Sequence, residues 1–137
     1  MEFLPGLTVV DSVAVGDIIE TARGADLAVF VILTGGREGR EAFFDTVRAT
    51  LPLDPPLQSS RSWDALSDSL WEGLIQLDSD GIVIAWSDAA DFKDVSPTEY
   101  ETALAVLGDV VESIGDSVGT CGRPKMVSVY VGGRRGS

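Results

Sequence analysis

The sequence of 137 residues contains no histidine and one cysteine, Cys121. Without histidine, the commonest general base near neutral pH is missing, and so is every nucleophile that histidine activates. A single cysteine cannot form a disulfide within the chain, and with no histidine the usual zinc sites are out of reach. We therefore expect no metal and no cofactor, and a binding protein is favoured over an enzyme.

Long apolar runs are also missing. No run reaches the roughly 18 residues that span a bilayer, and Met1 to Gly6 lacks the basic leader and apolar stretch of a signal peptide. We expect a cytoplasmic protein without membrane contact, and its length fits a single domain that folds on its own.

Positive charge is scarce, and the formal net charge is -12. Between Asp54 and Asp116 there are 14 acidic residues against two basic ones, Arg61 and Lys93, whereas the rest of the chain is balanced. Such a block repels nucleic acid and attracts a basic protein. We expect a basic partner and no nucleic acid, although net charge can also serve solubility alone.

Apolar patterning predicts an α/β fold. Three β-rich runs alternate with helical patterns, which is typical of a parallel sheet. The expected strands are 27–33, 82–86 and 126–131, and the expected helices are 38–51, 63–74 and 97–114. With right-handed crossovers between neighbouring strands, these helices all lie on one face of a three-stranded sheet.

The two ends of the chain carry weaker signals. Residues 1–26 are expected to be an N-terminal extension of the same domain, with an extended stretch at Leu7 to Val10 and a short helix ending at Gly24. This extension could cover part of the other face of the sheet. Residues 27–131 form the predicted main domain, and 132–137 a flexible tail.

Three local motifs make specific predictions. Ser62 is expected to cap helix 63–74, and Ser96, Pro97 and Glu99 form a capping box for the helix that follows. The loop Thr34 to Gly39 lacks the spacing of phosphate-binding loops, so it is interpreted as a tight turn.

Acidic residues form a stripe on helix 63–74. Asp64, Asp68 and Glu72 are spaced four residues apart, so they project from one face and repel each other. Trp71 borders this stripe, and an aromatic residue beside acids is typical of a protein interface. On the pattern alone, a solvated face remains an alternative to a binding face.

The order of elements and several sequence segments resemble the barstar family of intracellular ribonuclease inhibitors. The segments are Phe43-Phe44, Leu51-Pro52-Leu53, Trp63-Asp64-Ala65-Leu66-Ser67-Asp68-Ser69-Leu70 and the strand that ends in Trp86. The resemblance covers about Leu27 to Val131. It implies a barstar-like, three-stranded parallel sheet with helices packed on it, and a helix that blocks the active site of a basic, secreted, guanyl-specific ribonuclease.

The resemblance also implies which residues bind. Asp64 and Asp68 correspond to the two aspartates that face the enzyme, with Asp68 at the substrate phosphate position, and Asp109 corresponds to a further acidic contact. Departures lie in Leu57 to Ser62, where the family has aromatic residues, glycine and asparagine, and at Ser67, where it has tryptophan. Trp71, Glu72, Arg61 and Ser62 complete the expected partner-binding set.

Two alternatives remain open from the sequence. One is an interaction module that keeps this scaffold and binds a protein other than a nuclease. The other is a hydrolase that uses the carboxylates of Asp64 and Asp68.

Overall fold

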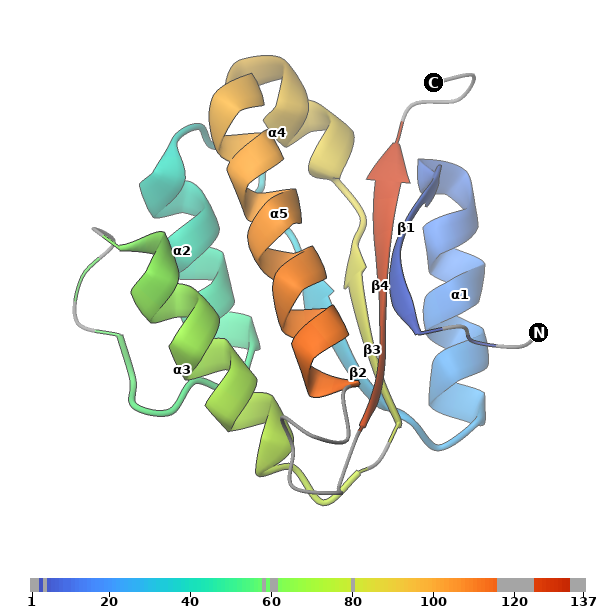
Figure 1. The fold of residues 1–137 in the computed structure, drawn as a ribbon. Helices are drawn as coiled ribbons and strands as arrows, with labels where there is room; N and C mark the ends of the chain where they lie inside the picture. Colours follow the sequence, from blue (N-terminus) through green and yellow to red (C-terminus); the bar gives the residue numbers. More distant parts are fainter. Residues whose placement is uncertain are drawn as a thin grey trace.

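The computed structural model describes residues 3, 5–57, 59, 62–79, 81–115 and 125–133. Strands and helices alternate along this part of the chain (Figure 1). The elements are β1 (Gly6–Asp11), α1 (Ser12–Gly24), β2 (Ala28–Ile32), α2 (Arg40–Thr50), α3 (Trp63–Ile75), β3 (Gly81–Trp86), α4 (Ala89–Val95), α5 (Pro97–Ile114) and β4 (Met126–Gly133).

The sheet is parallel and has the strand order β1-β4-β3-β2. The predicted alternation of strands and helices is confirmed, but the prediction of three strands was wrong. The fourth strand comes from the N-terminal extension, where Gly6 pairs with Ser128 and Asp11 with Gly133. Its apolar alternation is short, and its pairing partner lies at the far end of the sequence, which explains why only an extended stretch was expected. β4 continues to Gly133, two residues beyond the predicted end, and 134–137 lie outside the described residues.

Helices cover both faces of this sheet. The three helices predicted in the main domain share one face, as expected, and the helix on the other face comes from the N-terminal extension. In Figure 1, α2, α3 and α5 lie on one side of the strands and α1 lies on the other. α1 buries Ile18 and Ala22 against Val83 of β3. The expectation that the extension could cover part of the second face is thereby confirmed. Its helix begins after Asp11, whose carboxylate accepts the Val13 amide at 3.0 Å.

The main core lies between the sheet and α2, α3 and α5. Aromatic rings fill its centre: Phe43 of α2 lies 5.0 Å from Trp86 of β3, and Phe92 of α4 lies 5.5 Å from the same indole. This core gives α3 and α5 a rigid support, and their outer faces remain at the surface.

α4 was not predicted from the sequence. It has seven residues and buries only Ala89 and Phe92, which is too little to produce a helical pattern in the sequence. The residue before it, Asp88, accepts the backbone amides of Thr34 and Gly35 at 3.0 and 2.8 Å. The turn after β2 therefore binds a carboxylate of the protein itself, which agrees with the interpretation of this loop as a turn.

Ser96 stands before α5 as predicted, and Pro97 is the first helical residue, but the predicted capping box does not form. The Ser96 hydroxyl makes no capping bond to its own helix and accepts the Gly39 amide at 2.7 Å instead. The Ser96 hydroxyl therefore bonds to the loop before α2 instead of to the first turn of α5.

We expect Ser96→Ala to lower the free energy of unfolding by about 1–3 kcal/mol, because the partly buried Gly39 amide loses its acceptor. Urea denaturation measures the loss. Hydrogen exchange identifies its cause: the Gly39 amide should exchange faster, while the amides of the first turn of α5 should not. Unchanged exchange at Gly39 would contradict this assignment.

Candidate partner-binding site

The acidic helix α3 has one buried, apolar face and one face at the surface. Leu66, Leu70 and Leu74 are buried in the main core, so the residues between them are turned outward. Ser62 caps the helix as predicted, since its hydroxyl accepts the Ala65 amide at 3.1 Å. Because the core fixes the rotation of the helix about its axis, it also fixes where the acidic side chains point.

The loop before α3 packs closely against the helix and sets its position. At Gly73, a Cβ atom would collide with the carbonyl group of Pro52, so only glycine allows this approach. The Asp54 amide donates to the Ser69 carbonyl at 3.0 Å, and the Ser69 hydroxyl donates to the carbonyl of Pro55. Contacts along two helical turns therefore hold the loop and the helix together.

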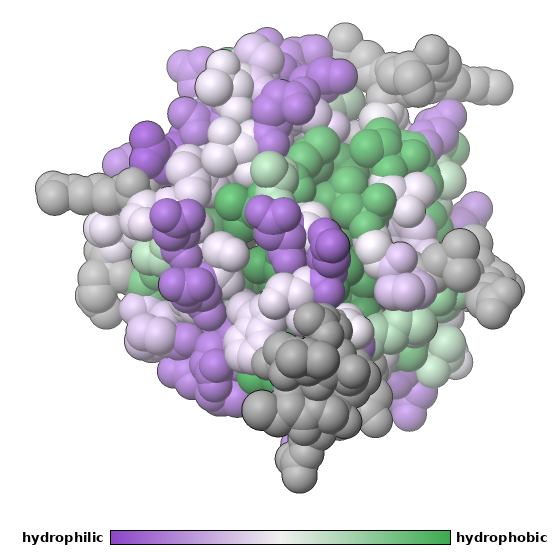
Figure 2. All heavy atoms as spheres, in the orientation of Figure 1, coloured by the Kyte–Doolittle hydropathy of each residue, from purple (hydrophilic) through white to green (hydrophobic). Residues whose placement is uncertain are grey.

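α3 and α5 lie side by side and form the two walls of a groove of about 440 Å³. Its lining residues are Ser67, Asp68, Trp71 and Glu72 from α3, and Asp109, Val110 and Ser113 from α5. Four residues from the predicted set are thus brought together, although Asp109 is distant from the others in sequence. Figure 2 shows hydrophilic side chains gathered along α3.

The other predicted residues lie apart from this groove. Asp64 is exposed one turn earlier on α3 but does not line the groove, and Ser62 holds the N-cap position. Arg61 lies outside the described residues. The partner-binding role of the whole set stays a prediction.

Sequence reasoning missed three of the lining residues. Ser67 occupies the position where the family usually has tryptophan, and a departure from the family pattern does not by itself indicate a lining residue. Val110 follows Asp109 directly, and Ser113 lies one helical turn after Asp109, so the (i, i+4) rule could have identified Ser113.

The carboxylates at the groove are not neutralised within the described residues. Asp68 and Asp109 form no hydrogen bond or ion pair there, and neither does Asp64. Glu72 accepts the Gln76 side-chain amide at 3.2 Å, but this neutral group leaves the charge in place. The result is a concave surface with uncompensated negative charge.

Three basic side chains on the same face bind other groups, and Lys93 lies away from this groove. Arg48 and Arg37 bind the Asp45 carboxylate at 2.6 and 3.1 Å and lower the pKa of Asp45. Lys125 is buried, and its ammonium donates to the backbone carbonyls of Leu77 and Ser79 just beyond α3. Because these basic groups are already bound, they do not neutralise the groove acids, which can therefore bind a cation of another molecule.

Trp71 gives the groove an apolar wall. Its ring packs against the main core, and its indole Nε1 is buried without a hydrogen-bond partner in the described part of the chain. Trp63 is also partly buried and packs on the core, as its position in the apolar stripe predicts, with its ring centre 4.9 Å from that of Phe44. An aromatic wall beside free carboxylates is a common composition for a protein interface.

In the described ranges, Asp and Glu side chains form no group of three or more that could hold a metal ion. None of the described helices combines the length and apolar character needed to cross a membrane.

The fold and the groove define a parallel α/β protein with an acidic recess between two helices on one face of its sheet. Residues 27–123 match the family model of Barstar (barnase inhibitor), so the chain belongs to the barstar family. Comparisons with curated proteins and with solved structures gave no match. Proteins of this family are inhibitors and not enzymes, and membership implies a ribonuclease as the general class of partner.

Proposed function

We propose that this protein inhibits a basic, secreted, guanyl-specific ribonuclease by binding its active site one to one through the acidic face of α3. The observation that carries the proposal is the groove between α3 and α5, where Asp68 and Asp109 meet with no cation from the described residues to neutralise them. Family membership supplies the class of partner.

The proposed mechanism is charge mimicry. Ribonuclease active sites bind phosphates with cationic side chains, and carboxylates on a rigid helix present comparable negative charge. Asp68 would take the place of a substrate phosphate, Asp64 would bind one turn away, and Asp109 would contact the enzyme from α5. Because these three groups have no partners among the described residues, binding requires no internal bond to break first.

Trp71 and Glu72 would complete the contact. The indole ring supplies apolar surface beside the charges, and ring burial at the centre of an interface is a common source of affinity. We place the encounter in the cytoplasm, where an inhibitor protects the cell before its ribonuclease is exported. No cofactor is required.

Titration against a panel of small, basic, guanyl-specific ribonucleases tests this function. We expect the activity of one member to fall linearly and vanish at one equivalent of inhibitor, because binding is stoichiometric. If no member is inhibited at micromolar concentrations of both proteins, the proposal fails.

One alternative follows from the departures before and within α3. Leu57 to Ser62 and Ser67 differ from the usual family residues, so the same scaffold could bind a protein that is not a nuclease. Pull-down from the native lysate distinguishes these two functions. Recovery of a basic nuclease supports the inhibitor, and reproducible recovery of a different protein supports the alternative. A hydrolase using Asp64 and Asp68 would instead show turnover when substrate is in large excess.

A further inference from the structure

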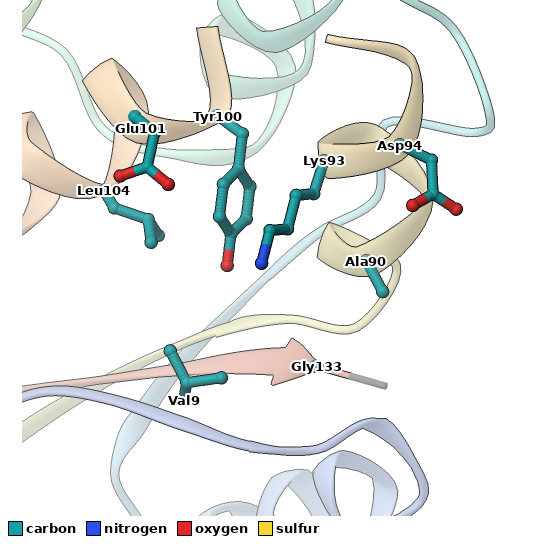
Figure 3. A pocket seen from close by; sticks show the side chains of 8 residues that line it. All are labelled: Val9, Ala90, Lys93, Asp94, Tyr100, Glu101, Leu104 and Gly133. Atoms are coloured by element: carbon teal, nitrogen blue, oxygen red, sulfur yellow. The ribbon is translucent and has the colours of Figure 1, made fainter. Parts of the chain in front are cut away.

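A second hollow of about 420 Å³ lies on the same face of the sheet, away from the acidic groove. It is lined by Val9, Ala90, Lys93, Asp94, Tyr100, Glu101, Leu104 and Gly133. The two hollows share no lining residue. Figure 3 shows the side chains of α4 and α5 above the ends of β1 and β4.

This hollow exists because α5 covers only part of β1 on this side: Leu7 packs on the main core, but Val9 does not. Val9 points into it from β1 and is 51% exposed, which is unusual for a large apolar residue in a sheet. Gly133 contributes no side chain beside it. Leu104 faces Val9 from α5, and Figure 2 shows an apolar area beside α5 at this place. The walls are therefore largely apolar and open to solvent.

The position agrees with a general rule for parallel sheets. The chain leaves β1 toward α1 on one face and leaves β3 toward α4 near the other, and β4 lies between these two strands. Ligands of open α/β proteins bind in the crevice at the carboxyl ends of strands where the connections diverge in this way. Its volume also falls within the range of small-molecule sites.

Two hydrogen-bond donors converge at the polar end of the hollow. The Lys93 ammonium lies 5.6 Å from the centre of the Tyr100 ring, and Figure 3 shows it beside the phenol hydroxyl. Neither group forms a hydrogen bond or an ion pair in the described part of the chain. Burial, with a smaller contribution from Glu101, raises the pKa of Tyr100, so its hydroxyl keeps its proton at neutral pH.

The surrounding charges limit which anion fits. Glu101 lies on the rim, Asp94 turns away from the hollow and has another contact, and the whole chain carries a net charge of -12. A polyanion such as a nucleotide would be repelled by this field. A single carboxylate needs only the one cation and the one hydroxyl that are present.

We propose that this hollow binds a small amphipathic monocarboxylate, with its carboxylate at Lys93 and Tyr100 and its apolar body between Val9 and Leu104. The site is separate from the ribonuclease-binding face, so it adds a second function to the first.

Phenylpropionate is a suitable probe, with phenylpropanamide as its neutral match and phenylpropylamine as its cationic one. In NMR titrations of the full chain, phenylpropionate should shift the amides of Val9, Leu104 and Gly133 saturably at millimolar concentration. Lys93→Met keeps the apolar stem and removes the charge, and it should weaken binding about tenfold or more. Tyr100→Phe should weaken it by a smaller factor, and Ala90→Leu should fill the hollow and abolish binding.

Several results would overturn the proposal. They are the absence of saturable shifts up to about 10 mM, equal binding of the acid and the amide, tighter binding of the amine through Glu101, or full binding by Lys93→Met. Lys93→Met should still inhibit the ribonuclease, because Lys93 is outside the acidic groove. A failure of this proposal is thereby distinguishable from a failure of the inhibitor function.

Discussion

Asp68→Ala is expected to weaken binding to the target ribonuclease by at least about 2–5 kcal/mol, because the cations that it faces would be left buried and unpaired. The stability of the unbound protein should not decrease. Asp68 is exposed, has no partner in the described residues, and repels Asp64 and Glu72 one turn away on each side. Its removal should leave the free energy of unfolding unchanged or raise it by about 0.2–0.5 kcal/mol per relieved pair.

Asp17→Ala is the matched control, since Asp17 is also an exposed aspartate within a helix and α1 lies on the opposite face of the sheet. Both variants lose one negative charge, so a general loss of electrostatic attraction would affect them equally. We expect the Asp17→Ala protein to inhibit almost as tightly as the wild type. An Asp68→Ala protein that folds and inhibits with unchanged affinity would show that α3 is only a solvated face.

Gly73→Ala should lower the free energy of unfolding by about 1–3 kcal/mol or more, as overpacking of a tight contact does. The new methyl group would collide with the backbone carbonyl of Pro52, and a backbone group cannot move aside as a flexible side chain can. Intrinsic helix propensity predicts the opposite, since alanine is better than glycine in a helix by about 1 kcal/mol. Chemical denaturation therefore distinguishes the two effects: a lower free energy of unfolding indicates the collision with Pro52, and a higher one indicates helix propensity alone.

Gly16→Ala serves as its control. Gly16 lies within α1, and a Cβ atom there would have nothing within 4 Å. We expect this variant to gain about 0.5–1 kcal/mol from helix propensity alone. If Gly73→Ala were stabilised to the same degree, the close packing of the Pro52 loop on α3 would not exist in solution.

Local sequence patterns predicted the helices well because each depends on residues near one another. The apolar stripe of Leu66, Leu70 and Leu74 predicted both α3 and its buried face. α4 was missed because seven residues with two buried side chains carry too little pattern. The role of Ser96 was misjudged for a different reason: its partner Gly39 lies far away in the sequence, and a local motif cannot reveal a distant competitor.

The residues of the candidate site also differ in whether a local sequence pattern could predict them. The four-residue spacing of Asp64, Asp68 and Glu72 is enough to predict that these acids share one face of a helix. Asp109 came only from the family resemblance, since no local rule joins α5 to α3. Val110 required the packing of the two helices, whereas Ser113 lies four residues after Asp109 and the Arg48–Asp45 ion pair has (i, i+3) spacing within α2, so helical spacing alone could have indicated both.

β4 is the strand on which the assembly of the sheet depends most. It hydrogen-bonds to β1 on one side and to β3 on the other, although β1 comes from the opposite end of the described chain. Until 126–133 are in place, β1 has no strand to pair with and β3 has an open edge. Contacts between residues so distant in sequence slow folding, and open edges invite pairing with other chains. The last strand of the described residues therefore completes the sheet: it covers the open edge of β3 and leaves β1 and β2 as the edge strands.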